Sequence, residues 1–242
     1  MKVVAIIQAR TGSTRLPAKV LLDISGASML ERVVTRTQRA KRLDGVVVAT
    51  TVQPADDAIM EICADHGWSC FRGSEEDVLD RYYRAAIEFQ ADVIVRITSD
   101  CPLIDPEIVS RIIEEFLDHQ PEAEYVSNTW PKRTFPRGLD IEVIRFDVLE
   151  RAWREDDNLA WREHVTPYIY RNPERFRIHS VTNDVDYSFM RWTVDTLEDL
   201  MLVRRIYEHF GDDQFSWLDV VALLEEHPEW TEINRHIQQK LV

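Results

Sequence analysis

Glycine, cysteine and lysine are all scarce in this chain. Only seven of its 242 residues are glycine, and three of them, Gly12, Gly73 and Gly138, lie in loops beside polar residues. The three cysteines are odd in number and form no C-x-x-C pair, which favours a reduced, cytoplasmic setting over a disulfide framework. Five lysines stand beside 24 arginines, so Lys19 is a rarer residue than any single arginine.

Long apolar runs are also missing. No stretch approaches the ~20 apolar residues that a membrane-spanning helix needs. The opening apolar run, 3–7, stops at Gln8 and has no tail of the kind that a signal peptidase cleaves. We therefore expect a cytoplasmic protein with neither a signal peptide nor a membrane partner.

Positive charge is in short supply. The chain has 29 Lys and Arg against 43 Asp and Glu, a formal net charge of −14. No basic face is visible, which argues against a nucleic-acid partner. The same charge repels nucleotides and sugar phosphates, so an anionic ligand would need local cations, a metal ion, or both.

What is present is an ordinary globular composition with a regular pattern. Short β-branched runs alternate with helical periodicity over the first 120 residues, which predicts strands at 3–7, 45–51 and 92–98 and helices at 29–40, 56–67, 75–89 and 106–119. This alternation predicts an α/β fold, with a mostly parallel sheet covered by helices on both faces.

The second half of the chain is less regular. We expect an extended segment at 123–130, a strand running into a helix over 138–155, a helix at 162–172 that Pro167 starts or kinks, strands at 176–182 and 191–195, and helices from Leu197 onward. The length suits one large domain.

The stretch QARTGSTRLPAKVL, residues 8–21, follows the first predicted strand. A strand, a glycine-containing loop and a helix place backbone N–H groups where they can bind phosphate, and Arg10, Arg15 and Lys19 add positive charge. The stretch is neither a Walker A loop nor G-x-G-x-x-G, which weakens ATPase and dinucleotide interpretations. A solvated basic loop is the structural alternative.

Six segments carry a wider resemblance. They are QARTGSTRLPAKVL, FRGSEEDVLDRYY, ITSDCPLIDP, RTFPRGLDIEV, REHVTPYIY and RWTVDTLEDL, and they span residues 5 to about 205. This pattern resembles the sugar cytidylyltransferases, including the CMP-sialic acid and CMP-KDO synthetases, and most of all their SpsF-like spore coat polysaccharide branch. One departure is Gln8-Ala9-Arg10, where the synthetases usually begin with P-A-R.

The resemblance implies a three-layer α/β/α, Rossmann-like nucleotidyltransferase fold over 1–242, with a nucleotide-binding half (1–125), a sugar-binding and dimerisation half (126–195) and C-terminal helices (196–242). It implies that a sugar or sugar acid attacks the α-phosphate of CTP, or of another nucleoside triphosphate, to give a CMP-sugar and pyrophosphate for surface polysaccharide synthesis. Arg10 and Lys19 would be catalytic. The nucleotide-binding candidates are Gln8, Ala9, Arg10, Thr11, Gly12, Ser13, Arg15, Lys19, Thr50, Arg72, Gly73, Ser74 and Ser99.

Two carboxylates are candidates for a metal site. Asp100 follows the predicted strand 92–98, and Asp195 ends the predicted strand 191–195. Both strands should deliver their carboxyl ends to one rim, where two carboxylates with phosphate oxygens and waters suit Mg²⁺. The alternatives are a loop or capping residue at Asp100 and a helix N-cap at Asp195 with Glu198 at the box position. The matched motifs favour metal binding for both.

The sugar site has weaker signals. Arg137 and Asp140 are expected to bind an anionic or hydroxylated sugar, with a solvated ion pair in a tight turn as the equal alternative. His164 matches a sugar-site position, although a lone histidine on a helix is more often a packed residue. Likewise, a plain turn at 71–74 is the equal alternative to nucleotide binding there.

Two rival functions remain open. A glycosyltransferase that uses a finished nucleotide sugar would hold its metal with D-x-D, and Asp184-Val185-Asp186 fits that weak pattern. A non-catalytic nucleotide-binding homologue is disfavoured because Arg10, Lys19, Asp100 and Asp195 are all intact. The resemblance also implies a homodimer.

Overall fold

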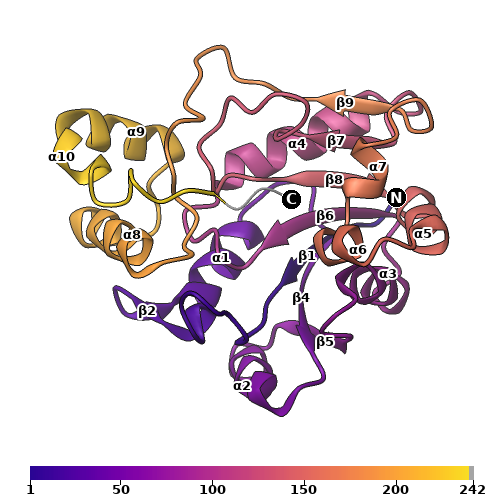
Figure 1. Cartoon of the computed structure of the whole chain (residues 1–242), viewed down its shortest axis with the longest axis horizontal. Helices are drawn as coiled ribbons and strands as arrows, with labels where there is room; N and C mark the ends of the chain where they lie inside the picture. Colours follow the sequence, from indigo (N-terminus) through magenta and orange to yellow (C-terminus); the bar gives the residue numbers. More distant parts are fainter. Residues whose placement is uncertain (240–242) are drawn as a thin grey trace.

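A central mixed sheet organises the molecule (Figure 1). The computed structural model describes residues 1–239, so the last three residues of the predicted segment 196–242 lie outside the described residues. In the described chain the sheet has seven strands, in the order β5 (Ser69–Gly73), β4 (Gly45–Thr51), β1 (Val3–Gln8), β6 (Val93–Thr98), β8 (Glu142–Arg145), β7 (Tyr125–Ser127) and β9 (Ile178–Ser180). The first four strands are parallel, β8 runs antiparallel to both β6 and β7, and β9 is parallel to β7.

Helices cover both faces of this sheet, which confirms the predicted three-layer α/β/α fold. One face carries α1 (Met29–Gln38), α2 (Asp57–Asp65) and α4 (Pro106–Asp118), joined by α8 (Leu197–Phe210), α9 (Trp217–Glu226) and α10 (Pro228–Thr231). The other face carries α3 (Val78–Glu88), α5 (Phe146–Glu155), α6 (Leu159–His164) and α7 (Pro167–Tyr170). Two 3₁₀ turns, Lys19–Leu21 and Pro54–Asp56, and a small hairpin of β2 (Asp23–Ile24) and β3 (Ala27–Ser28) complete the described elements.

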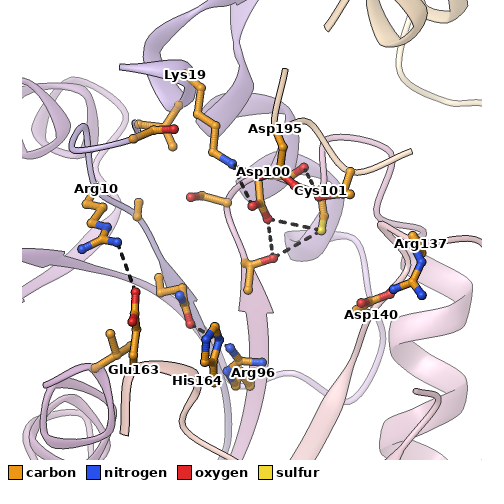
Figure 2. A pocket seen from close by; sticks show the side chains of 18 of the residues that line it. Arg10, Lys19, Arg96, Asp100, Cys101, Arg137, Asp140, Glu163, His164 and Asp195 are labelled. Carbon is orange, nitrogen blue, oxygen red and sulfur yellow. Dashed lines mark hydrogen bonds and ion pairs between the residues drawn. The ribbon is translucent and has the colours of Figure 1, made fainter. Parts of the chain in front are cut away.

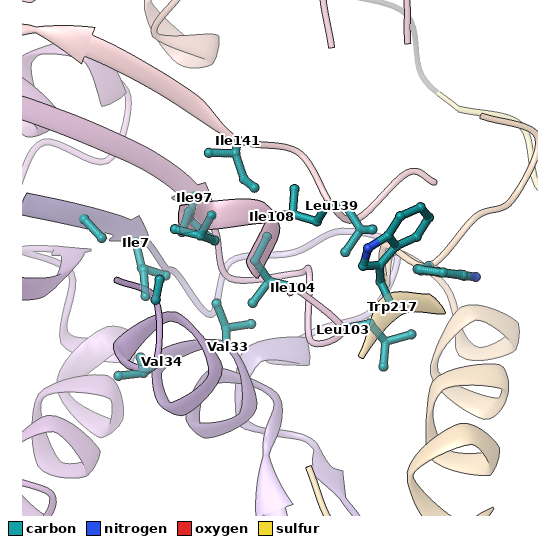
Figure 3. Close-up of a cluster of buried hydrophobic side chains, with 14 of the residues drawn as sticks. Ile7, Val33, Val34, Ile97, Leu103, Ile104, Ile108, Leu139, Ile141 and Trp217 are labelled. Atoms are coloured by element: carbon teal, nitrogen blue, oxygen red, sulfur yellow. The ribbon is translucent and has the colours of Figure 1, made fainter. Parts of the chain in front are cut away.

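Strand β1 shows why the sequence has apolar runs rather than an alternating pattern. Val3, Ala5 and Ile7 pack into the core under α1 and α4, whereas Val4 and Ile6 pack into the core under α3 and α5. Figure 3 shows the first of these cores, from the end of β1 across to Trp217 of α9. A strand buried on both faces has no solvent side, so polar alternation is lost.

The order of the parallel strands sets the position of a site. The strand order reverses between β1 and β6: the connection after β1 leads to β4 on one side, whereas the connection after β6 leads the other way, past β8 to β7. Ligands of open α/β sheets bind at such a switch point, beyond the carboxyl ends of the strands. Residues 8–19 and 98–101 lie at these two ends.

Several predicted elements are confirmed with small shifts of their ends, but the predicted strand at 191–195 is wrong. This segment is extended, and its hydrogen bonds go to two different neighbours: Trp192 N donates to Arg137 O at 2.7 Å and Val194 N donates to Asp100 O at 2.8 Å. Only the isolated bridge between Arg137 and Arg191 has sheet geometry. Because Trp192 and Val194 bond to two different segments of the chain, the hydrogen bonds do not form a continuous ladder with one partner strand.

The predicted helix at 162–172 is two short helices. Helix α6 ends at His164, Val165 takes a positive φ of 70°, and Pro167 starts α7, as expected for a proline at this position. The sequence analysis did not predict strand β5 or the β2–β3 hairpin. None of the helices in the part of the chain that the structure describes is long and apolar enough to span a membrane.

Candidate active site

A pocket of about 600 Å³ opens at the carboxyl ends of β1 and β6 (Figure 2). Its walls come from the loop after β1, the end of β6, the loop that leads into β8, helix α6 and the extended segment 193–195. The predicted residues that line it are Gln8, Ala9, Arg10, Gly12, Ser13, Arg15, Lys19, Ser99, Asp100, Arg137, Asp140, His164 and Asp195. Segments far apart in the chain therefore meet at one place.

Lys19 lies at the centre of the polar contacts in this pocket. Its ammonium donates to Asp100 Oδ2 at 2.9 Å, to Asp195 Oδ1 at 2.9 Å and to the Val194 carbonyl at 2.8 Å. An ammonium has three donors, so all of them are engaged. The prediction that Lys19 binds the triphosphate stays a prediction, and it requires one of these bonds to be exchanged for a phosphate oxygen.

The second oxygen of each aspartate is held by the protein. Asp100 Oδ1 accepts from Thr98 Oγ1 at 2.6 Å, and Asp195 Oδ2 lies 3.0 Å from Arg15 and 2.9 Å from Arg191. The remaining oxygens, Asp100 Oδ2 and Asp195 Oδ1, face the same cationic nitrogen. Two hard carboxylate oxygens facing one cation are a donor set that fits Mg²⁺.

The charges of this cluster change its protonation behaviour. Burial by itself lowers the pKa of Lys19, but attraction to Asp100 and Asp195 outweighs burial and raises that pKa above its ordinary value. For Asp100, burial raises the pKa, whereas the Lys19 charge and the bond from Thr98 lower it further than burial raises it. Both groups are therefore charged at neutral pH.

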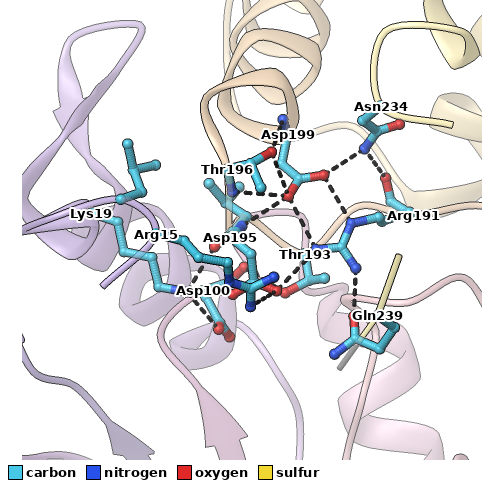
Figure 4. Close-up of polar contacts among 12 residues, drawn as sticks. Arg15, Lys19, Asp100, Arg191, Thr193, Asp195, Thr196, Asp199, Asn234 and Gln239 are labelled. Carbon is cyan, nitrogen blue, oxygen red and sulfur yellow. Dashed lines mark hydrogen bonds and ion pairs between the residues drawn. The ribbon is translucent and has the colours of Figure 1, made fainter. Parts of the chain in front are cut away.

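A buried network behind Asp195 fixes its position (Figure 4). Arg191 donates to Asp195 Oδ2 at 2.9 Å and to Asp199 Oδ1 at 2.9 Å, and Asn234 donates to Asp199 Oδ1 at 2.8 Å. The cap of α8 is Thr196 with Asp199 at the third position, so the suggested cap at Asp195 with Glu198 is wrong. Asp195 precedes the N-cap, so its carboxylate does not cap α8 and faces the pocket instead.

The loop after β1 is hydrogen-bonded to the segment between β4 and α2. Thr11 donates to Asp56 Oδ1 from both its backbone N–H and its hydroxyl, each at 2.7 Å. Arg10 lies 3.5 Å from Glu163 of α6, which places its guanidinium across the mouth of the pocket (Figure 2). These contacts hold the loop from both sides.

Five predicted nucleotide-binding residues do not line the pocket: Thr11, Thr50, Arg72, Gly73 and Ser74. Thr50 is fully buried in β4, and the Ser74 hydroxyl accepts from the backbone of Asp77 ahead of α3. Arg72 donates to the carbonyls of Thr51 and Gln53. The described contacts of Arg72 and Ser74 therefore belong to the connections around β4 and β5.

The sugar-site candidates lie at two places in the pocket: Arg137 and Asp140 on one side, and His164 beside Arg96 on the other (Figure 2). Asp140 pairs with Arg133, whose Nη2 donates to Asp140 Oδ2 at 2.8 Å, so the expected ion pair of Asp140 forms with a different arginine. Arg137 lines the pocket beside this pair (Figure 2). Burial, and then the charge of Arg96, lower the pKa of His164, which keeps the imidazole neutral at neutral pH.

Two arginines of the pocket wall, Arg81 and Arg96, were not predicted from the sequence. Arg96 interrupts the apolar strand β6 and pairs with Glu142 of β8, and a charged residue inside an apolar strand was the available signal. Arg81 of α3 is buried, and its Nε and Nη1 find no hydrogen-bond partner among the described residues. Unpaired buried donors facing a pocket are costly unless a ligand accepts from them.

The D-x-D pattern lies elsewhere. Asp184, Val185 and Asp186 are exposed, and none of them lines this pocket. Asp186 accepts from the backbone of Ser188 at 2.9 Å, which is an ordinary turn contact. The structure therefore removes the observation that supported a glycosyltransferase.

Comparison with known proteins gives a consistent result. The family model described as cytidylyltransferase matches residues 4–217. The spore coat polysaccharide biosynthesis protein SpsF of Bacillus subtilis is 32% identical over 93% of this chain and 94% of that protein. A 3-deoxy-manno-octulosonate cytidylyltransferase of Koribacter versatilis is 32% identical over 72% of this chain and 69% of that protein.

A solved structure agrees over the full length. A cytidylyltransferase from Leptospira borgpetersenii superimposes with a TM-score of 0.92 at 36% identity, and the match covers 100% of both chains. Taken with the pocket at the switch point, these matches identify the chain as a nucleotidyltransferase that belongs to the cytidylyltransferase family.

Proposed function

We propose that this enzyme transfers CMP from CTP to a hydroxyl group of a sugar or sugar acid, with release of pyrophosphate, in an Mg²⁺-dependent reaction that supplies surface polysaccharide synthesis. The observation that carries the proposal is the convergence of Asp100 Oδ2 and Asp195 Oδ1 on Lys19 in a pocket that arginines surround. The names of SpsF and of the 3-deoxy-manno-octulosonate enzyme support a saccharide acceptor.

The protein's own part in this reaction is positioning and charge compensation. An acceptor oxygen attacks the α-phosphorus in line with the departing pyrophosphate, so the enzyme has to hold both groups and neutralise their charge. Arg10 and Arg15 line the pocket and would bind phosphate oxygens, and Lys19 would exchange one of its aspartate contacts for a phosphate oxygen. Asp100 and Asp195 would hold Mg²⁺, which when bound neutralises phosphate charge.

The acceptor would occupy the part of the pocket between His164 on one side and Arg137 with Asp140 on the other (Figure 2). The Arg137 guanidinium lines the pocket and is suited to a carboxylate, because arginine can bind one through two parallel hydrogen bonds. The neutral imidazole of His164 can accept from or donate to a sugar hydroxyl. The Arg137 guanidinium therefore favours a sugar acid over a neutral sugar.

Product analysis tests the proposal directly. The chain is incubated with Mg²⁺, CTP and a panel of sugar acids and neutral sugars, and pyrophosphate and CMP-sugar are measured, with UTP, GTP and ATP in parallel. We expect pyrophosphate with CTP and a sugar acid, and its loss in Asp195→Asn. Release of a nucleoside diphosphate from a nucleotide sugar, with no pyrophosphate from CTP, would contradict the proposal.

A further inference from the structure

A second cluster of metal-ligating side chains lies outside the pocket, at the edge of the sheet. Glu115 belongs to the last turn of α4, His119 follows four residues later, and His179 lies in the edge strand β9 (Figure 1). Residues four apart on a helix share a face, and this face is turned toward β9. None of the three residues lines the pocket described above.

The potential ligand atoms of the cluster are close together. All three residues offer a ligand atom within 4.8 Å of the other two. Glu115 Oε2 lies 3.3 Å from His179 Nε2, and the His119 ring is also near, with its Nδ1 3.6 Å from Glu115 Oε2. The two imidazole rings stack, with their centroids 4.1 Å apart.

One hydrogen bond prepares a histidine for this role. His119 Nδ1 lies 2.8 Å from the carbonyl oxygen of Glu115, and because a carbonyl can only accept, Nδ1 carries the proton. In the neutral ring Nε2 therefore keeps its lone pair. When a histidine binds a metal through one ring nitrogen, the other nitrogen usually donates to a carbonyl, carboxylate or water, which fixes the orientation of the ring.

The cluster is also accessible to an ion. The side chains of Glu115, His119 and His179 are 34%, 45% and 32% exposed, so an ion can enter from solvent without displacing packed residues. The negative charge of the whole molecule favours cations near its surface.

We propose that Glu115, His119 and His179 bind a divalent transition-metal ion of the Zn²⁺ type and thereby join the end of α4 to the edge strand β9. Two imidazole nitrogens and one carboxylate oxygen suit Zn²⁺, Co²⁺ or Ni²⁺, whereas Mg²⁺ prefers oxygen ligands alone. Three protein ligands leave a further position for water. The proposal is independent of the reaction proposed for the pocket.

Calorimetric titration of the full, tag-free chain with Zn²⁺ in excess Mg²⁺ tests this site, since Mg²⁺ competes at the oxygen ligands of the pocket. We expect one Zn²⁺ per chain and a higher melting temperature. Loss of a residue that only hydrogen-bonds to a metal ligand lowers metal affinity about 10–100-fold. The variants His119→Gln and His179→Gln each remove a ligand itself, so each should lower Zn²⁺ affinity at least about tenfold. Bound Co²⁺ should give visible absorption bands that both variants lose.

His66→Gln is the matched control. His66 Nε2 also pairs with a glutamate, Glu31, at 2.9 Å and is 42% exposed, but it belongs to no three-ligand cluster of the described residues. This variant should keep full Zn²⁺ affinity. Zn²⁺ binding that persists unchanged in His119→Gln and His179→Gln, or no binding by the parent chain at millimolar Zn²⁺, would overturn the proposal.

Discussion

At the scale of single residues, the pocket depends on how Lys19 and the two aspartates compensate one another. Lys19 and Asp100 are largely removed from water, and the charge of each raises or lowers the pKa of the other toward its charged form. Removing Lys19 leaves two carboxylates facing each other in the same small space, and removing either aspartate leaves Lys19 with one carboxylate partner fewer. The site therefore behaves as a unit rather than as three separate contributions.

Lys19→Ala should reduce turnover strongly while the chain still folds. Loss of a positioned donor to developing charge costs about 10²–10³ in kcat, and Lys19 also holds both aspartates in place. Steady-state pyrophosphate release measures the loss, and circular dichroism checks the fold. Lys41→Ala is the control, because the Lys41 side chain is 70% exposed. Full activity in Lys19→Ala would exclude Lys19 from the site.

Asp56→Asn should destabilise the protein in a pH-dependent way. Burial raises the pKa of Asp56, but hydrogen bonds from Thr51 and Thr11 lower it further, so the folded pKa is below the unfolded value of about 4. Ionised Asp56 therefore stabilises the fold above about pH 4, and this contribution is lost as the pH falls through the folded pKa. At neutral pH the variant should lose about 1–3 kcal/mol.

Urea unfolding of both proteins over a series of pH values measures this effect. The difference between parent and Asp56→Asn should shrink as the pH falls below about 4. Asp57→Asn is the control, because Asp57 is 58% exposed and pairs only at the surface with Arg72. A difference that stays constant with pH would show that the charge of Asp56 is not involved.

At the scale of elements, the segment 191–195 is the critical one. It carries Asp195 to the pocket without belonging to the sheet, and it is held by the backbone around Gly138. Gly138 has a φ of +106°, and a Cβ there would lie 2.8 Å from Thr193 N and from the Trp192 carbonyl carbon. Only glycine allows the two segments to approach this closely.

Gly138→Ala should therefore displace the segment that bears Asp195. We expect a loss of about 1–3 kcal/mol from the strained φ alone, together with weaker binding of CTP. Thermal unfolding with and without CTP and Mg²⁺ measures both effects. Gly45→Ala serves as the comparison, since a Cβ at Gly45 would meet nothing within 4 Å in the described chain. Equal behaviour of the two variants would refute this account.

The elements also show what could be predicted from the sequence. Buried strands such as β1 and β4 and the capped helices were predictable, because apolar runs, periodicity and capping residues are local signals. RWTVD was predicted to be a strand, but the hydrogen bonds of that segment are divided between Arg137 and Asp100. Such a division depends on tertiary packing and leaves no local pattern.

The candidate site was predictable where spacing in a motif marked it, as for Arg10, Lys19, Asp100 and Asp195, all of which line one pocket. Arg81 was not predictable, since its helical position looks like that of any surface arginine and only packing buries it. The partners Arg96 and Glu142 are 46 residues apart, so their pairing also depends on the folded sheet.

At the scale of the whole molecule, we expect a homodimer, as the family resemblance implies. The described surface exposes large apolar side chains, including Phe189 at 76% and Leu159 at 80%, which a partner could cover. Light scattering at micromolar concentration should give twice the chain mass of 28.4 kDa. A mass of one chain across a dilution series would contradict this prediction.

The wall of the pocket includes Gln239 as well as Gln8, and Gln239 accepts a hydrogen bond from Arg191 behind Asp195. A chain still under synthesis displays Lys19 and Asp100 long before Asp195 and the tail leave the ribosome. Nascent or C-terminally clipped copies that lack Asp195 and Gln239 therefore have only part of the polar wall of the pocket.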